Sequence, residues 1–340
     1  MVQAPTEPSM TSATVLRHTD AAHELAGVRL VQEIGLAQEQ FVYDETERVW
    51  SLRLPPLPVW RLEYRLELRY PDGRTELVRD PANPLITPGA FGDKSVLELP
   101  GYRRPAWLDR PAAEGTWTDL TIPSTALRRE VPVRIRTSAQ PSRGILLAHD
   151  GGEFDRLAGL GQFSAAMIAD GTLPPHDLVL LSPVERNEWY SANPAYARAL
   201  VTEIIPRLRP GLPIVALGAS LGALSLLHAQ IRYPYTFQGL FLQSGSFFQN
   251  RYDAQESSFP PYPRIIRFVG SVRRRRRVDD PVSTVLTCGI PEENLANNRA
   301  MATILGPNAR LVEVPDAHNF IAWRDAWHPD LTALAGRVWE

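Results

Sequence analysis

The chain has 340 residues, of which 44% are hydrophobic and 22% charged, and its formal net charge at pH 7 is −2. This composition indicates a globular protein with two domains, or one large α/β domain with an extension. The nearly balanced charge argues against nucleic-acid binding, and the lack of an apolar run of about 18 residues argues against a membrane-spanning helix. Cys288 is the only cysteine, which excludes a disulfide within the chain, and the first residues lack the pattern of a secretion signal. We therefore expect a cytoplasmic protein.

The N-terminal third of the chain is predicted to be rich in β-structure. Residues 1–20 are polar and are expected to form a flexible arm, and residues 21–36 a helix, since apolar side chains recur there every three residues. Apolar and charged residues alternate from Arg61 to Tyr70, which indicates a strand with one buried face. Further strands are expected at 41–43, 49–54, 74–78 and 95–99. Residues 21–115 are thus predicted to form a small β-sandwich domain that ends in a linker over 101–115.

Residues 116–340 show a different pattern, in which short apolar strands alternate with helices. Strands are expected at 117–122, 131–136, 144–149, 178–181, 212–217, 239–242, 283–287 and 309–314. Helices are expected near 157–169, 194–208, 221–232, 293–305 and 320–336. This alternation predicts an α/β domain with a mostly parallel sheet covered by helices on both faces. Residues 244–280 lack clear periodicity and are predicted to be a long loop that covers the substrate.

A run of five arginines occupies residues 273–277. Like charges packed this densely repel one another, so we interpret the run as part of a solvated loop. The alternative is a contact with an anionic substrate beside the site.

The most informative motif is Gly218-Ala219-Ser220-Leu221-Gly222, which has the form G-x-S-x-G. An apolar strand pattern precedes it and a helical pattern follows it. A strand that ends in a tight turn and leads into a helix lifts the serine hydroxyl out of the sheet, and small flanking residues permit that turn. The motif predicts that Ser220 is a catalytic nucleophile.

A serine nucleophile needs a base, and three histidines follow Ser220 in the chain. His318 follows a late strand in a loop, which is where an α/β-hydrolase places its base. His228 lies inside the helix after the motif, and His328 lies inside a predicted helix. We therefore predict that His318 is the base and that the other two histidines are structural.

The acid that orients the base is expected after the preceding strand. Glu292 and Glu293 follow the strand at 283–287 and are both placed correctly, and either could instead be a first-turn helix acid. We favour Glu292 over Glu293, with Asp316 and Asp280 as further alternatives.

An oxyanion hole needs two backbone N–H donors. Leu221 supplies one, directly after the nucleophile. The other is expected from the loop Asp150-Gly151-Gly152, where glycines allow a close approach to substrate; Gly152 is the first choice and Gly151 the second. Asp150 is expected to shape this loop. No metal-ligand spacing, P-loop or dinucleotide motif occurs, so no cofactor and no metal are expected.

With these motifs the chain resembles the enterochelin (ferric enterobactin) esterase family of α/β-hydrolases, which is related to esterase D and to the antigen 85 type mycolyltransferases. The resemblance extends over nearly the whole chain. It rests on stretches 80–84, 95–102, 147–151, 186–189, 193–196, the motif at 218–222, 288–295 with Asn298-Arg299, and His318 with Trp323-Arg324. The family commonly has Gly-Gly-His-Asp at the histidine, whereas this chain has Asp316-Ala317-His318-Asn319.

The resemblance implies an immunoglobulin-like β-sandwich before the hydrolase domain, and it supports Glu292 as the acid. It implies a serine esterase that acts through an acyl-enzyme on a small-molecule ester such as a ferric siderophore lactone, with Asp150, Gly151, Arg186 and Trp323 near the substrate. The alternatives are an acyltransferase of the antigen 85 type and a non-catalytic binding protein on the same fold. No nucleic-acid or membrane partner is expected, and a homodimer is left open.

Overall fold

The computed structural model describes residues 14–209, 211–274 and 282–340, which divide into two compact units. The first unit contains the described residues up to Arg104 and two later segments, Gly289–Glu292 and Pro315–His318. The second unit contains the described residues of Pro105–Cys288 together with Glu293–Val314 and Asn319–Glu340. The change of unit after Arg104 lies inside the stretch expected as a linker.

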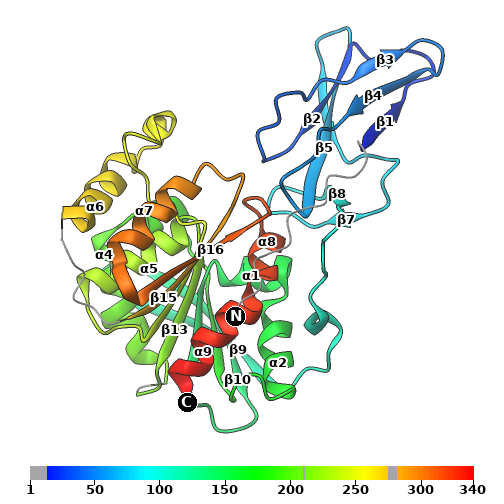
Figure 1. Cartoon of the computed structure of the whole chain (residues 1–340). Coiled ribbons are helices and arrows are strands. Elements are labelled where there is room, and N and C mark those ends of the chain that lie inside the picture. The colour runs from blue at the N-terminus through cyan, green and yellow to red at the C-terminus, as the bar shows by residue number, and fades with distance from the viewer. Residues whose placement is uncertain (1–13, 210, 275–281) are drawn as a thin grey trace. The chain divides into compact units, whose positions relative to one another are not determined.

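The first unit consists of two small sheets, coloured blue to cyan in Figure 1. Strands β1 and β3 pair with β4, strands β2, β6 and β8 pair with β5, and β7 pairs with β8, all of them antiparallel. One sheet has the order β1 (Val15–Thr19), β4 (Val49–Arg53), β3 (Val42–Asp44). The other has the order β2 (Gly27–Val31), β5 (Arg61–Arg69), β8 (Lys94–Glu98), β7 (Ile86–Thr87), with β6 (Thr75–Val78) paired to β5. Side chains of both sheets, among them Leu52 and Leu66, pack into one apolar core.

Two predictions for this unit are wrong. Residues 15–19, expected in a flexible arm, form β1 and pair with β4. Residues 27–31, expected in a helix, form β2 against β5. Residues three apart fall on opposite faces of a strand, and the burial observed here follows a period of two: Val28 and Leu30 are fully buried whereas Arg29, between them, reaches Glu67. The partner strand supplies the hydrogen bonds that decide between the two patterns.

The second unit is built on an eight-stranded sheet, in the order β16, β15, β14, β13, β11, β12, β10, β9. The neighbouring pairs from β12 to β15 are parallel, and β10 and β9 add antiparallel strands at one edge. The strands are β9 (Gly115–Ser124), β10 (Arg129–Ser138), β11 (Ile145–His149), β12 (Asp177–Leu181), β13 (Ile214–Ala219), β14 (Gly239–Gln243), β15 (Ser283–Gly289) and β16 (Ala309–Val314). The predicted mostly parallel sheet is confirmed.

Helices cover both faces of this sheet (Figure 1). They are α1 (Gly151–Ala158), α2 (Leu160–Ala169), α3 (Arg186–Tyr190), α4 (Pro194–Arg198), α5 (Leu221–Arg232), α6 (Tyr262–Arg274), α7 (Leu295–Leu305), α8 (Phe320–Asp325) and α9 (Thr332–Trp339). Short 3-10 or π-helical segments are η1 (Ala106–Asp109), η2 (Ala199–Ile204), η3 (Ile205–Arg207), η4 (Ala254–Ser258), η5 (Gly306–Asn308) and η6 (Trp327–Leu331). Successive residues of a strand point to opposite faces, so Leu147 joins the core under α5 whereas Leu146 joins the core under α2 and α9.

Several predicted helices have different limits from those expected. The helix expected at 157–169 begins earlier, at Gly151, and is divided by Gly159, whose φ of 71° ends α1 and starts α2. The helix expected at 320–336 is interrupted near His328, which has a non-helical backbone before Pro329. A proline inside an apolar helical pattern removes an N–H donor and ends the regular hydrogen bonding.

The expectation of a structureless loop over 244–280 is also wrong for its described part. This stretch contains η4 and the thirteen-residue helix α6. Tyr262, Ile265, Val269 and Val272 form one buried face of α6, which is the spacing of an amphipathic helix. Arg273 and Arg274 end this helix, whereas the rest of the arginine run lies outside the described residues.

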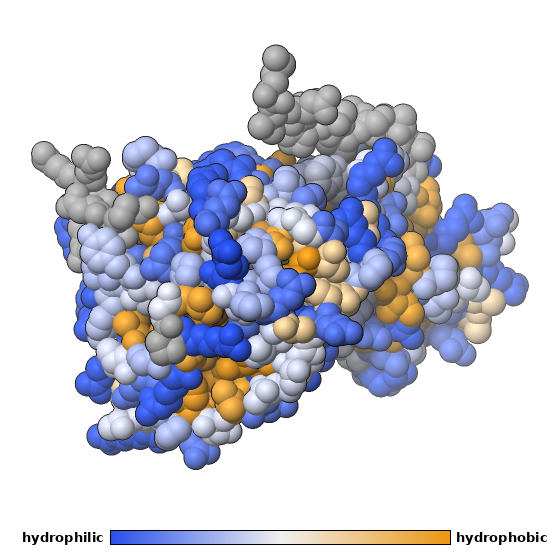
Figure 2. Space-filling model, turned by 90° about the horizontal axis from the view of Figure 1, so that it is seen from below, coloured by the Kyte–Doolittle hydropathy of each residue, from blue (hydrophilic) through white to orange (hydrophobic). Residues whose placement is uncertain are grey.

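The described residues contain no helix long and apolar enough to cross a membrane. On the face drawn in Figure 2, apolar residues lie in small groups between polar ones. Scattered exposed apolar side chains of this kind are ordinary for a protein surface.

Candidate active site

Ser220 lies at the turn between β13 and α5, with φ 56° and ψ −123°. A positive φ is rare for a residue with a side chain and costs on the order of 1–3 kcal/mol. Neighbouring backbone groups hold the turn: the Ser220 N–H donates to the Gln243 carbonyl at 2.9 Å, and the Ser220 carbonyl accepts from Leu224 and Ser246, each at 3.2 Å. The strained strand–turn–helix geometry expected of the G-x-S-x-G motif is therefore present.

Close contacts explain why both Gly218 and Gly222 of the motif lack a side chain. A Cβ on Gly218 would lie 2.8 Å from the carbonyl carbon of Gly222, closer than real side chains approach a backbone. A Cβ on Gly222 would lie 3.3 Å from His149 Cβ and 3.4 Å from Asp150 Oδ2. The turn after β13 is thus packed against both its own helix and the turn after β11.

The two predicted oxyanion donors lie in first turns of neighbouring helices. Leu221 is the first residue of α5, and Gly152 is the second residue of α1. First-turn N–H groups have no acceptor within their own helix, and the helix dipole makes them favour negative charge. These helices start at the carboxyl ends of β13 and β11, which are adjacent and parallel, so both N-termini lie at the same edge of the sheet.

Gly151, the second choice for the oxyanion donor, is fixed by packing. A Cβ there would lie 2.5 Å from the Cα of Leu180 on β12. Gly151 is buried, whereas Gly152 is exposed. The contact explains why the first position of α1 has no side chain.

Asp150 and Arg186, both predicted near the substrate, pair with each other. Arg186 Nε and Nη2 donate to the two carboxylate oxygens of Asp150 at 2.8 and 2.7 Å. Such a bidentate pair fixes both planar groups, and Asp150 is only 5% exposed. Asp150 has φ 51° and precedes α1, so the ion pair holds the strained corner from which Gly152 projects.

His149, at the end of β11, is completely buried and supports the same corner. Its Nδ1 lies 3.1 Å from the Gly222 carbonyl, which can only accept, so Nδ1 carries the proton and Nε2 accepts from the Tyr196 hydroxyl at 3.0 Å. The ring also stacks on Tyr190 at 4.4 Å. Burial lowers the pKa of His149 to about 3, so the ring is neutral near pH 7.

The predicted base and acid are brought together. His318 Nδ1 lies 2.7 Å from Glu292 Oε2, and Glu292 Oε1 accepts from the Gly289 N–H at 2.7 Å. The Glu292 side chain is 3% exposed and that of His318 is 34% exposed. With Nδ1 bonded to the carboxylate, Nε2 is the nitrogen that can take up a proton from another group.

Most of the residues weighed against these two make other contacts. Glu293 is exposed, accepts from Gln255 and does not share the Glu292–His318 hydrogen bond. His228 is buried in α5 against Phe268, where burial lowers its pKa to about 4, and His328 bonds Thr332. The Asp316 carboxylate accepts from the Ala317 N–H, and Asp280 lies outside the described residues.

Two residues beside His318 that differ from the Gly-Gly-His-Asp pattern, Ala317 and Asn319, have clear local roles. Asn319 is the N-cap of α8, and its side-chain oxygen accepts from the Ala322 N–H at 2.9 Å. Asparagine serves this position as well as aspartate does. Ala317 is buried in the core of the first unit, so a methyl group fills space that a glycine would leave empty.

Sequence reasoning missed the turn after β14, Ser244-Gly245-Ser246. Ser246 Oγ lies 3.1 Å from Ser220 Oγ, and Ser246 is 2% exposed. Trp323, predicted near the substrate, donates from Nε1 to Ser244 Oγ at 2.9 Å. The signal in the sequence was a run of small residues directly after a buried strand.

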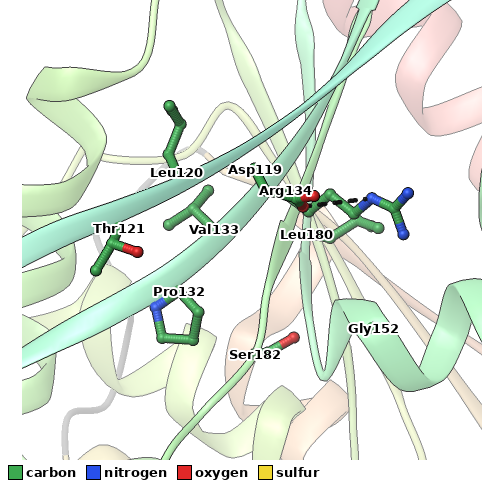
Figure 3. Close-up of a pocket in the computed structure, with 9 residues that line it drawn as sticks. All are labelled: Asp119, Leu120, Thr121, Pro132, Val133, Arg134, Gly152, Leu180 and Ser182. Carbon is green, nitrogen blue, oxygen red and sulfur yellow. Dashed lines mark ion pairs between the residues drawn. The ribbon is translucent and has the colours of Figure 1, made fainter.

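A cleft of about 360 Å³ adjoins Gly152. Its walls come from β9 and β10, the end of β12 and Ser182, as Figure 3 shows. Apolar side chains such as Val133 and Leu180 line it together with the polar Ser182 and Thr121 and the ion pair of Arg134 with Asp119 (3.5 Å). A Cβ on Gly152 would lie 2.9 Å from Ser182 Oγ, so the glycine keeps this wall open.

Within the described ranges, no group of three or more His, Cys, Asp or Glu side chains is arranged to hold a metal ion.

Comparison with known proteins gave matches among solved structures. Neither the protein-family models nor the curated protein sequences gave a match to this chain. An enterobactin esterase from Shigella flexneri, solved in the presence of enterobactin, is 19% identical, with 96% of this chain and 92% of that chain covered and a TM-score of 0.75. The ferric enterobactin esterase from Salmonella typhimurium is 18% identical, with 96% and 94% covered and a TM-score of 0.75.

A ferulic acid esterase is 14% identical, with 67% of this chain and 100% of that chain covered and a TM-score of 0.56. The chain therefore has an α/β-hydrolase-like fold. The match to the enterobactin esterases extends over both units, and the predicted resemblance to them is confirmed at the level of fold.

Proposed function

We propose that this protein is a serine esterase in which Ser220, His318 and Glu292 form a catalytic triad. The observation that carries the proposal is the strained Ser220 turn, with its hydroxyl at the end of β13 and helix N-termini beside it. The hydrogen bond between His318 and Glu292 supplies the second half, an imidazole that is oriented through Nδ1 and can accept a proton at Nε2. Strands β13, β14 and β15 are parallel, and Ser220 and Glu292 follow two of them in the order that this fold uses.

The proposed reaction has two steps. Ser220 Oγ attacks the ester carbonyl carbon as its proton passes to His318 Nε2, and the amides of Leu221 and Gly152 stabilise the oxyanion. The alcohol leaves with the proton from His318, and an acyl-Ser220 remains. Water then attacks as His318 takes its proton, and the acid is released while that proton returns to Ser220 Oγ.

For the substrate, we propose an ester of the siderophore-lactone type. The support is the fold shared with enterobactin esterases over 96% of the chain. On the same ground we propose that the N-terminal unit is an immunoglobulin-like sandwich.

The test of the mechanism compares matched variants on p-nitrophenyl esters and on enterobactin. We expect Ser220→Ala to lower kcat/KM by about 10⁴-fold or more and Glu292→Gln by about 10²- to 10⁴-fold. Glu293→Gln removes the neighbouring, exposed carboxylate and is expected to stay within about twofold of the parent. Parent-like activity in Ser220→Ala would refute the proposal. Product analysis with added alcohols would reveal acyl transfer. If the protein hydrolyses the p-nitrophenyl esters but not enterobactin, the proposed substrate is refuted and the esterase mechanism stands.

A further inference from the structure

The turn after β14 places a second hydroxyl beside the proposed nucleophile. Ser246 Oγ lies 3.1 Å from Ser220 Oγ, and the Ser246 N–H donates to the Ser220 carbonyl at 3.2 Å. Ser246 is 2% exposed, so its hydroxyl is largely cut off from bulk water. A buried hydroxyl proton needs an acceptor, because an unsatisfied one costs about 1–3 kcal/mol.

The position of Ser246 is built by buried side chains. Asn298, which is fully buried on α7, accepts from the Gly245 N–H at 3.0 Å and donates to the Gly245 carbonyl at 3.1 Å. Asn294 donates to the Ser244 carbonyl, and the Trp323 indole donates to the Ser244 hydroxyl. Every residue of the turn is therefore held by a partner from outside it, which fixes Ser246 Oγ relative to the end of β13.

We propose that Ser246 is a further catalytic residue, whose hydroxyl donates a hydrogen bond to Ser220 Oγ. This inference rests on the proposed function, in which the proton of Ser220 goes to His318. Ser220 then acts toward Ser246 as the acceptor, and Ser246 is the donor of the pair.

The hydrogen bond gains strength as the reaction proceeds. At 3.1 Å it is longer than the usual 2.7–2.8 Å between hydroxyls, and bonds to charged oxygens shorten further. Ser220 Oγ gains negative charge as it loses its proton to His318, and again when it leaves the acyl group in the second step. A donor that binds more tightly to this charged oxygen than to the neutral hydroxyl lowers both barriers.

The proposal predicts a loss in both acylation and deacylation. We expect Ser246→Ala to lower kcat/KM on p-nitrophenyl butyrate, and the rate of labelling by a fluorophosphonate, about 10- to 100-fold. The deacylation rate should fall by a similar factor. Ser225→Ala is the matched control. Ser225 is also 2% exposed, but it lies in the second turn of α5 and not in the turn after β14. It should match the parent in both rates.

The outcomes separate this proposal from the proposed function. If Ser220→Ala is inactive while Ser246→Ala labels and turns over like the parent, the role of Ser246 is overturned and the esterase mechanism stands. If Ser220→Ala keeps parent activity, both fall. If Ser246→Ala does not fold, the near-isosteric Ser246→Cys, whose thiol is a weak donor, should show a loss of the same sign, and unchanged rates in it would overturn the proposal.

Discussion

Two turns flank the nucleophile strand, and they are stabilised by different chemistry. The turn after β11 depends on an ion pair between Asp150 and Arg186 and on the buried ring of His149. The turn after β14 depends on neutral groups, the amide of Asn298 and the indole of Trp323. Changes of pH and salt should therefore act on the first turn and leave the second unaffected.

The largest effect is expected from Asn298→Ala, which removes the support of the neutral turn. The Gly245 N–H and C=O and the Asn294 C=O would lose their partner in a buried site, so the free energy of unfolding should fall by about 3 kcal/mol. Activity per folded molecule should fall as well, since Gly245, which precedes Ser246, loses both of its bonds to Asn298.

Asn297→Ala is the control for this prediction. Asn297 is equally buried on the same helix, but it bonds Asp253 and Gln249 instead of the turn. It should lose stability in urea unfolding and keep its activity per folded molecule; equal activity losses in both variants would contradict the prediction.

Arg186→Met tests the charged turn. The Asp150 carboxylate would remain buried without its bidentate partner, and because Arg186 is itself 39% exposed we expect a loss of about 2–3 kcal/mol rather than the larger value for a fully buried pair. Urea unfolding at low and high salt should show a weaker salt dependence than in the parent.

Arg156→Met breaks an exposed pair with Glu153 on α1 and should cost less than about 0.5 kcal/mol. A similar loss in both variants would mean that burial of Asp150 does not strengthen its pair.

The buried histidine gives the charged turn a pH dependence. The pKa of His149 is lowered to about 3, below the usual 6.5. Between these two pH values the His149 ring is protonated in the unfolded chain and neutral in the folded chain. The contribution of His149 to the free energy of unfolding is fully present above pH 6.5 and is lost as the pH falls toward 3. At pH 5 the loss is about 2 kcal/mol.

Urea unfolding of the parent and of His149→Phe at pH 7 and pH 5 checks this. The phenyl ring can keep the stacking on Tyr190, so the variant should show the smaller fall in stability between the two pH values. An identical fall in both proteins would exclude His149 as its source.

Apart from the control variants, the smallest effect is expected from Trp323→Phe. It removes the hydrogen bond to Ser244 and should cost about 1 kcal/mol, with a fall in activity of about threefold. Trp327→Phe likewise removes an indole bond, to Gln243, but does not touch the turn, so its activity per folded molecule should be unchanged. A threefold loss of activity in Trp327→Phe as well would mean that losing either buried indole hydrogen bond lowers activity, and it would contradict a specific role of the bond to Ser244.

The same comparison explains what could be predicted from the sequence. The motif around Ser220 is local, because the strand, the turn and the helix are consecutive in the chain, and Gly218 and Gly222 mark the close approach. Glu292 could be favoured over Glu293 only weakly from the chain, since burial and the bond to His318 distinguish them. The ion pair of Asp150 with Arg186 was missed because both residues were interpreted separately.

Ser246 and Asn298 were missed for a different reason. Their importance comes from β14 lying beside β13 and from α7 lying beside the end of β14. Neither neighbour can be predicted from the residues next to Ser246 or Asn298 in the chain. The same holds for β2, whose pairing with β5 overrides a spacing that fits a helix. Local geometry was predictable, and the partners of each turn were not.

The antiparallel strand β9 has a consequence for self-association. In the described part of the chain it ends the eight-stranded sheet, and a ten-residue edge is a template on which a second molecule could add a strand. Pro123 has no N–H to offer such a strand, and Asp119 places a charge near its middle. Concentrated solutions of this protein should therefore resist edge-to-edge aggregation, and replacing both residues by Val should weaken that resistance.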